Sequence, residues 1–507
     1  MWRMAVFNIF LYLALTMVFT SLVSAEEYPN YEYVFENKDI LPFYITVDRA
    51  DWQKMWDQPF QYVKCTVRCF DEVYEDVGLR FKGNSSFGVR GLKKPYKLKF
   101  DKYKKQRFHG FKKLNFSNGF KDPSLLREKL AYDLFREADV PAPRTTFAKL
   151  YLTIPGEYDE EYIGFYTIVE QVDKVFLKDR FGDTGGSLFK GEGMADFIYR
   201  GDEPERYEKE YEAKLSEEQQ DYSVLIRFTK MLNETSDEEF PSEIRRVFNV
   251  ETFLSWLAVN TLLSNLDSYA GSGHNFYVYF RKDTAKCEFV PWDLNEAFGN
   301  FRMGRAEDMT DLRVYKPYAE PKILIQRIIN IPEFRERYIR KIKDLMDGPF
   351  QQSMMYDKID ALFNRIEADV RADPWKPFTT EEFVRSLNHH IGAGNNPMIN
   401  SILGLKPFVV ERIRSVNEQL AGKREGYVPR SFKKPPFDGE DPPMEDEISH
   451  RIDELHRLME ERKSKGIDIS EAERLDDESK EYAQRGDMKG AFELISKAIE
   501  LLKLSYP

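Results

Sequence analysis

The sequence is poor in cysteine, with only Cys65, Cys69 and Cys287 among its 507 residues. Three thiols cannot build the disulfide framework on which small exported domains depend. In the extended segment YVKCTVRCF, Cys65 and Cys69 would share one face but lie roughly 13 Å apart, too far for a bond between them. We therefore expect these thiols to pack beneath a sheet as small apolar side chains.

Excess positive charge is also missing. The chain has 75 Lys and Arg residues against 86 Asp and Glu, for a formal net charge of -11. This balance excludes a general nucleic-acid-binding protein, so local basic clusters should serve smaller anions such as phosphate groups. The length and the 42% apolar content allow two or three domains with a sizeable core.

Beyond its beginning, the sequence lacks any apolar run long enough to cross a membrane. Residues 1–25 combine Arg3, an apolar run and a small-x-small end at Val23-Ser24-Ala25, the pattern of a signal peptide cleaved after Ala25. We expect a secreted or surface-tethered protein. An uncleaved signal anchor is the alternative, because the apolar run is nearly long enough to span a bilayer.

The most informative stretch runs from 260 to 299. Asp267 and Asp293 each stand where an apolar run gives way to polar or small residues, and Asn275 opens the segment FYVYF. FYVYF (276–280) and CEFVPW (287–292) predict a β-hairpin that could bring the two carboxylates together. Carboxylate and amide oxygens suit Mg²⁺ or Mn²⁺ and suit zinc poorly.

Residues 40–100 predict strands and a phosphate-binding loop. The strands are expected at 40–47, 61–70 and 75–83, with a helix at 48–58, and the loop GNSSFGVRG precedes a fourth strand at 93–100. In that fourth strand Lys97 and Lys99 point away from Tyr96, Leu98 and Phe100. Lysines beside a Gly- and Ser-rich loop can cradle an anion, although a solvated strand face would look the same.

The next segments predict a helix followed by two strands. SLLREKLAYDLFREA (124–138) has the apolar spacing of an amphipathic helix, and TTFAKLYLTI with YIGFYTIVEQV read as a strand pair. The second strand ends at Glu170. A carboxylate there needs a partner because burying it bare is costly, or it is simply a surface residue at a strand end.

The C-terminal half is predicted to be mainly helical, which gives an α+β protein. Residues 196–247 are highly charged and suggest a solvent-facing helical insertion or lid, and 250–266 predict a buried helix leading to Asp267. Helical patterns also dominate 320–425, with a loop at 389–397. A Pro-rich linker at 428–447 separates a small helical appendage at 448–507, which could dock a partner, dimerise or cap the main domain.

Several motifs in order resemble the secreted atypical kinases related to spore coat protein H. They are VGLRFKGNSS (77–86), KKPYKLKF (93–100), SLLREKLAYDLF (124–135), GFYTIVEQVDKVFL (164–177), NLDS (265–268), HNFY (274–277) and PWDLNEAFG (291–299). The resemblance implies a kinase-like domain at 26–427 with two lobes, one β-rich and N-terminal, the other mostly helical. It also implies ATP and Mg²⁺ or Mn²⁺ as cofactors and Ser or Thr of an exported or surface protein as the acceptor.

The resemblance also implies roles for individual residues. Asp267 would be the catalytic base, Asp293 the principal metal ligand and Asn275 a second metal contact. Lys97 or Lys99 would hold the α- and β-phosphates, with Glu170 orienting that lysine. The remaining nucleotide contacts would be Arg80, Gly83, Asn84, Ser85, Ser86, Lys94 and Trp292, the last stacking on adenine.

Departures from ordinary protein kinases keep other functions open. The sequence has no G-x-G-x-x-G loop, has Asn265-Leu266 before Asp267 in place of H-R, and has Leu-Asn after Asp293. Asn295 also stands where the family pattern has Asp. An inactive extracellular binding or assembly protein and a metal-dependent hydrolase remain alternatives.

Overall fold

The computed structural model describes residues 28–429, except 84, 90, 217–219, 320 and 393–401, and most of 451–504. The expected signal segment and nearly all of the expected linker lie outside the described residues. The chain divides into two compact units, Met1–Phe432 and Lys433–Pro507. The first mixes helices with two β-sheets, which confirms the α+β class.

The first sheet is a closed barrel in which neighbouring strands follow the order β1-β2-β3-β4-β5-β7-β6. All its pairs are antiparallel except β1 with β6, which is parallel. The strands are β1 (Leu41–Thr46), β2 (Val63–Cys69), β3 (Glu72–Phe81), β4 (Tyr96–Lys99), β5 (Lys113–Ser117), β6 (Thr145–Ile154) and β7 (Tyr158–Glu170).

Side chains alternate along these strands as the sequence predicts. In β4, Tyr96 and Leu98 are buried in the barrel while Lys97 and Lys99 are only partly buried. Cys65 and Cys69 are buried and unbonded, and burial raises the pKa of both thiols. The barrel interior is therefore an apolar core of its own, and one outer face carries lysines.

The second sheet has the order β11-β10-β8-β9 and contains the predicted hairpin. Phe276 pairs with Pro291 at one end of the hairpin and Phe280 with Cys287 at the other. Its strands are β8 (Ser187–Gly191), β9 (Tyr211–Ala213), β10 (Phe276–Phe280) and β11 (Cys287–Pro291).

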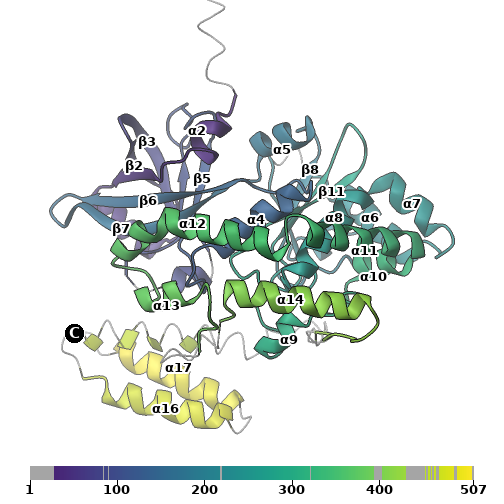
Figure 1. Ribbon diagram of the computed structural model, residues 1–507. Coiled ribbons are helices and arrows are strands. Elements are labelled where there is room, and N and C mark those ends of the chain that lie inside the picture. The colour runs from purple at the N-terminus through teal and green to yellow at the C-terminus, as the bar shows by residue number, and fades with distance from the viewer. Residues whose placement is uncertain are drawn as a thin grey trace, which may run out of the picture. The chain divides into compact units, whose positions relative to one another are not determined.

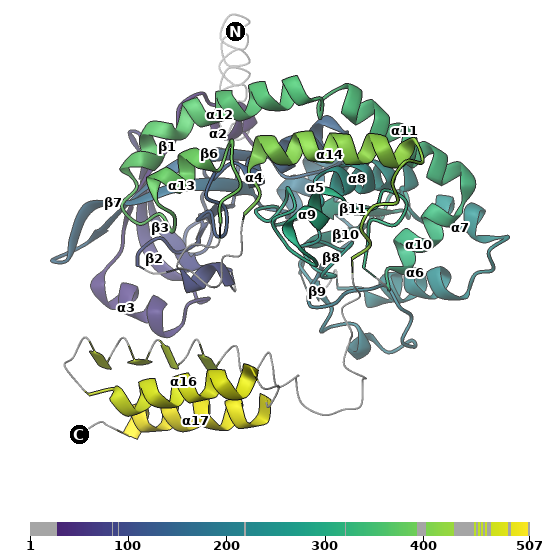
Figure 2. The same ribbon diagram turned by 60° about the horizontal axis from the view of Figure 1, so that its bottom comes forward.

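Helices of the first unit pack around both sheets. Figures 1 and 2 show the long α12 lying along β7 at one end and beside α14 further along, in agreement with its contacts. The helices are α2 (Tyr31–Phe35), α3 (Arg49–Asp57), α4 (Arg127–Glu137), α5 (Lys174–Phe181), α6 (Tyr222–Glu234), α7 (Phe240–Val247), α8 (Val250–Leu262), α9 (Ala306–Thr310), α10 (Ile323–Asn330), α11 (Pro332–Asp347), α12 (Gln352–Ala372), α13 (Thr380–Arg385) and α14 (Leu405–Leu420).

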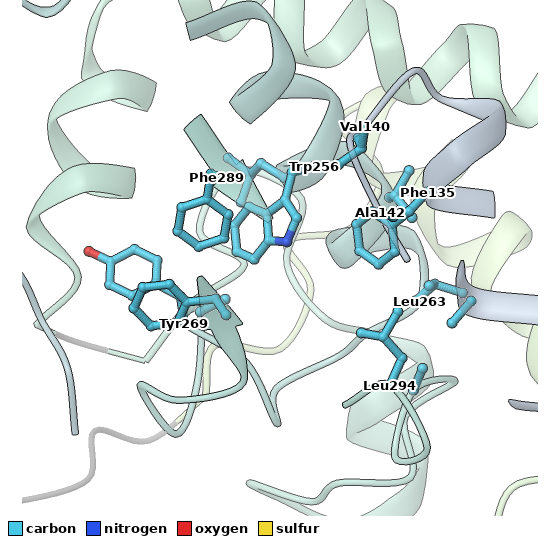
Figure 3. Close-up of a cluster of buried hydrophobic side chains, with 14 of the residues drawn as sticks. Phe135, Val140, Ala142, Trp256, Leu263, Tyr269, Phe289 and Leu294 are labelled. Carbon is cyan, nitrogen blue, oxygen red and sulfur yellow. The ribbon is translucent and has the colours of Figure 1, made fainter. Parts of the chain in front are cut away.

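Helix α8 is the centre of the larger core. Every side chain from Phe253 to Leu262 is buried. Figure 3 shows Trp256 of α8 beside Phe289 of β11, with ring centroids 4.5 Å apart. Aromatic side chains contribute large buried areas, so this packing fixes the end of α8 against the hairpin.

The segment 196–247 corrects the prediction of a solvent-facing insertion. It contains α6 and α7, but Phe197, Tyr207 and Tyr211 are buried in the larger core, and β9 is an edge strand of the second sheet. The many charged residues between these aromatic residues hide their buried positions from a reading of composition.

The second unit contains α16 (Ser470–Gln484) and α17 (Met488–Leu504), which share an apolar cluster that includes Leu475 and Ile499. Within the described residues of the whole chain, no helix combines the length and apolar character needed to cross a membrane.

Candidate functional site

A rigid turn after α8 places Asp267. The backbone N–H of Asn265 donates to the Asn260 carbonyl at 3.1 Å, and the Asn260 side chain donates to the Asn265 carbonyl at 2.9 Å. Gly271 is required in this turn, because a Cβ there would lie 2.0 Å from the Leu266 carbonyl oxygen. The loop is therefore fixed by its own hydrogen bonds and by the buried helix before it.

Asp267 is a buried carboxylate, 8% exposed, that three side chains contact. Its Oδ1 is 2.7 Å from His274 Nε2 and accepts a hydrogen bond from Ser272 at 3.2 Å, and its Oδ2 accepts one from Asn275 at 2.9 Å. Burial, followed by the charges of Glu296 and Asp293, raises the pKa of Asp267 well above its usual value.

Asp293 lies two residues after the end of β11 and belongs to the same group of charges. Its backbone has φ of +54°, and its N–H donates to the Tyr132 hydroxyl of α4 at 3.0 Å. Asn275, at the start of β10, has φ of +59° and accepts the Trp292 N–H at 3.1 Å through its carbonyl. The hairpin register therefore brings Asp293 next to the Asn275 and Asp267 loop.

Two further carboxylates, Glu128 and Glu296, were missed by the sequence reading. Glu296 is 6% exposed and pairs with Lys121 at 3.1 Å. Glu128, on α4, is 5% exposed, and burial together with Asp293 raises its pKa to about 8. The available signals were the quoted PWDLNEAFG motif for Glu296 and the four-residue spacing from Glu128 to Tyr132, whose hydroxyl contacts Asp293.

Lys97 is surrounded by other cations. In the barrel it pairs with Arg80 of β3 and with Asn115 of β5, and its ammonium donates to Gln171 Oε1. Burial lowers the pKa of Lys97 well below its usual value, and Lys113, Arg80 and Lys82 lower it further. Neighbouring positive charges repel one another when the site is empty. A bound anion would relieve this repulsion.

Lys99 lies on the same face, roughly 7 Å further along the strand. Burial lowers its pKa, and Asp101 opposes that shift. A carboxylate also acts on Lys97, since Asp173 opposes the lowering of its pKa, so the choice between the two lysines stays a prediction.

The loop before β4 is braced by Lys94. The Lys94 ammonium donates to the carbonyls of Phe87 and Val89 and lies 5.3 Å from the Trp56 ring centroid, and burial lowers its pKa to about 8. These carbonyls take up the ammonium group in this structure, and a contact between Lys94 and a nucleotide stays a prediction.

The described loop residues have backbone roles. Gly83 has φ of +76°, Ser85 and Ser86 begin a short 3-10 helix, and the Ser86 carbonyl accepts the Asn118 side chain at 3.1 Å. Asn84, the remaining predicted contact in this loop, lies outside the described residues.

Glu170 does not orient a lysine, which corrects that prediction. Its Oε2 accepts hydrogen bonds from the Arg180 side chain at 3.0 Å and from the Arg144 backbone N–H at 2.9 Å. The arginines therefore take the place expected for Lys97, which contacts the neighbouring Gln171 instead.

Trp292 packs edge-on against Tyr277, with ring centroids 5.4 Å apart, and is 8% exposed. The Tyr277 hydroxyl also hydrogen-bonds Gln171, the acceptor of Lys97. Stacking of Trp292 on a base would require its side chain to move, because its ring is buried.

The carboxylates do not form a closed metal cage. Among the described residues, no group of three or more His, Cys, Asp and Glu side chains is arranged to hold a metal ion. The pKa values of Asp267, Glu296 and Glu128 are nevertheless all raised, by burial and by the charge of Asp293. Carboxylates that repel one another are stabilised by a divalent cation between them. Mg²⁺ needs only one or two protein carboxylates, because it keeps several water ligands.

Comparison with known proteins gives a consistent assignment. The family model described as "CotH kinase protein" matches residues 79–415. The chain is 29% identical to inner spore coat protein H of Bacillus subtilis over 318 residues, covering 61% of this chain and 82% of that protein. It is 21% identical to invasin CotH2 of Rhizopus delemar over 359 residues, covering 66% of this chain and 60% of the invasin.

The matched region includes the end of β3, strands β4 and β5, and the residues Glu128, Asp267 and Asp293. It covers well over half of the chain. The protein therefore belongs to the CotH kinase protein family.

Proposed function

We propose that this protein is a secreted kinase that transfers the γ-phosphate of ATP to Ser or Thr of an exported or surface protein. The observations that carry the proposal are a cation group around Lys97 and a group of buried carboxylates, both influenced by Lys82. Glu128 links the two groups, since Lys82 lowers its pKa while Asp293 raises it. Phosphoryl transfer needs this combination of cations, metal-binding carboxylates and a positioned base.

The roles follow from the contacts of each residue. Lys97, assisted by Arg80, Lys82 and Lys113, holds the phosphates of ATP. Asp293 is the principal ligand of Mg²⁺ or Mn²⁺, and Asn275 is a second ligand through its side-chain oxygen, because its amide nitrogen already donates to Asp267. When bound, the ion neutralises negative charge on the phosphates.

Asp267 accepts the proton of the acceptor hydroxyl. The acceptor oxygen forms a bond to the γ-phosphorus while the bond from that phosphorus to the bridging oxygen of ADP breaks. A raised pKa makes a carboxylate a better proton acceptor. His274, Ser272 and Asn275 hold Asp267 in position.

The barrel and the helical remainder of the first unit would act as the two lobes of a kinase-like fold. Export is proposed because residues 1–25 have the pattern of a signal peptide, and because the relatives are named as a spore coat protein and an invasin. Those names fit proteins at a surface.

An inactive binding or assembly protein is the second candidate. Asn295 stands where the family pattern has Asp, and its amide donates to the Phe120 carbonyl at 3.0 Å, a structural role. Such a protein would keep the fold and would transfer no phosphate.

The proposal is tested by incubating the purified protein with labelled ATP, with Mg²⁺ or Mn²⁺, and with acceptor proteins, including the chain itself. We expect label transfer in the wild type and a loss of roughly 100-fold or more in Asp267→Asn and Asp293→Asn. Asparagine is the appropriate substitution at 293, because it tolerates the positive φ that alanine resists. Mg-ATP should also raise the Tm of the wild type.

Asp159→Asn, an exposed change in β7, is the control and should keep wild-type transfer. Equal transfer by the wild type and both site variants would refute the assignment of the base and the metal ligand. Nucleotide binding without any transfer would favour the inactive binding protein.

A further inference from the structure

A cavity of about 430 Å³ lies away from the Asp267 and Asp293 site. It is bounded by the end of α4, the segment before β6, the end of α5, the start of α8 and the far end of the β10–β11 hairpin. Arg281 of this cavity is six residues from Asn275, roughly 20 Å along an extended strand. The cavity is therefore distinct from the proposed nucleotide site.

Four guanidinium groups from different segments line the cavity: Arg136, Arg144, Arg180 and Arg281. Aromatic rings hold three of them, since Arg144 lies 3.6 Å from the Tyr31 ring centroid, Arg180 lies 4.8 Å from Phe176 and Arg281 lies 5.6 Å from Phe181. Planar guanidinium groups fixed in this way are suited to bind oxyanions through paired N–H groups.

Two arginines of this cluster, Arg136 and Arg144, keep N–H groups without an acceptor among the described residues. Arg144 Nε is buried without a hydrogen bond, and its Nη1 donates to Asp179 Oδ2 at 3.0 Å. Arg180 donates to the same oxygen of Asp179. Arg136 is exposed and forms no ion pair with a described residue. Arg180 also donates to Glu170 and to the Ala142 carbonyl, and Arg281 donates to Asp283, Glu288 and the Phe181 carbonyl. Within the described residues, the N–H groups without an acceptor therefore belong mainly to Arg136 and Arg144, since each guanidinium has five.

Two further features affect the charge of the cavity. Asn249 and Thr252, at the N-terminus of the 13-residue helix α8, also line it and add the partial positive charge of that helix end. The carboxylates Asp139, Asp179 and Glu288 of the lining offset positive charge, and so do Glu170 and Asp283, which pair with these arginines. Asp179 is the movable one, since it lies in the last turn of α5 with 28% of its side chain exposed.

We propose that this cavity binds a phosphate group, which replaces Asp179 as the acceptor shared by Arg144 and Arg180. Arg136 then pairs with the bound phosphate, and the four tetrahedral oxygens accept N–H groups that have no protein partner. The group belongs either to free phosphate or to a phosphorylated side chain. The inference does not depend on the proposed kinase activity, because phosphate binding is measured without ATP.

Calorimetric titration of the full chain with inorganic phosphate, in a buffer without other oxyanions, tests the site. We expect Arg136→Gln to weaken binding roughly tenfold, because a charged hydrogen-bond donor is lost. Asp179→Asn should strengthen binding by about tenfold, because a competing negative charge is removed. Arg340→Gln, an exposed arginine of α11, is the matched control and should bind as the wild type does.

Phosphate could instead bind beside Lys97, and Lys97→Met separates the two sites. Binding that survives Lys97→Met and responds to Arg136→Gln supports the cavity. Binding abolished by Lys97→Met and unchanged in both cavity variants would overturn the proposal, as would no binding at tens of millimolar phosphate. A phosphoserine peptide that binds more tightly than phosphate identifies a phosphorylated protein as the source, and equal affinity identifies the free ion.

Discussion

Glu128 makes stability depend on pH. Its pKa of about 8 in the folded protein compares with about 4.3 in an unfolded chain. Between these pH values the folded protein keeps a proton that the unfolded chain has released. The stabilisation is therefore complete below about pH 4.3 and is lost as pH rises toward 8.

Glu128→Gln should remove this dependence. In metal-free buffer we expect the free energy of unfolding of the wild type to fall, relative to Glu128→Gln, by on the order of 3 kcal/mol between pH 5 and pH 8. Urea unfolding at both pH values measures the difference. Glu137→Gln, at the exposed end of the same helix, is the control and should follow the wild type. Parallel changes in the wild type and Glu128→Gln would contradict this role of Glu128.

At the scale of residues, the sequence reveals a site residue only where its neighbours along the chain give a signal. Asp267, Asn275 and Asp293 could be identified as candidate site residues because each stands at an end of an apolar run. The hairpin between them can also be predicted from the sequence. The partners of Glu170 could not be selected, because Arg144 and Arg180 meet it only after α5 packs against the start of β6. Glu128 was hidden in an amphipathic helix that buries a carboxylate among apolar side chains.

Helix α12 is fastened to the barrel by a buried ion pair. Asp373, which caps the helix, pairs with Lys93, and both side chains are fully buried. Asp373 also accepts the backbone N–H groups of Phe165 and Trp375, each at 2.9 Å. The pair joins the segment before β4, strand β7 and the end of α12.

Asp373→Asn should lower the free energy of unfolding by roughly 3–5 kcal/mol, because it leaves the Lys93 ammonium buried without a counter-charge. Asp369→Asn is the matched control one turn earlier in α12. Its pair with Lys149, at 3.1 Å, is about one quarter exposed and should contribute less than about 1 kcal/mol. Urea unfolding of both variants measures the contrast. Equal decreases in the free energy of unfolding in the two variants would contradict the larger contribution expected of the Asp373–Lys93 pair.

At the scale of elements, residue patterns predicted the longer strands and helices and the short strands β4, β10 and β11, but they missed β8 and β9. β9 has only three residues, and β8 (Ser187–Gly191) pairs with β10, a strand more than 80 residues later in the chain, so neither has a local partner in the sequence. The closure of the barrel by the parallel pairing of β1 with β6 has no sequence signal either, because it joins segments about 100 residues apart.

At the scale of the whole molecule, composition indicated a separate C-terminal segment, and contacts divide the chain between Phe432 and Lys433. Residues of the second unit form their own apolar cluster, which includes Leu455, Ile469, Leu475 and Ile499. A segment with its own core can unfold separately from the remainder.

A chain ending at Phe432 should therefore keep the first unit folded. We expect the full chain to unfold in two calorimetric transitions and the truncated chain in one, with the midpoint of the remaining transition changed by less than about 2 °C. Phosphate transfer should persist in the truncated chain, because Lys97, Asp267 and Asp293 all belong to the first unit. The truncated chain could fold but lose the biological role of the protein, while Asp267→Asn and Asp293→Asn keep that role. This outcome would favour the assembly protein over the kinase. Loss of the remaining transition would instead show that the first unit depends on the second for its stability.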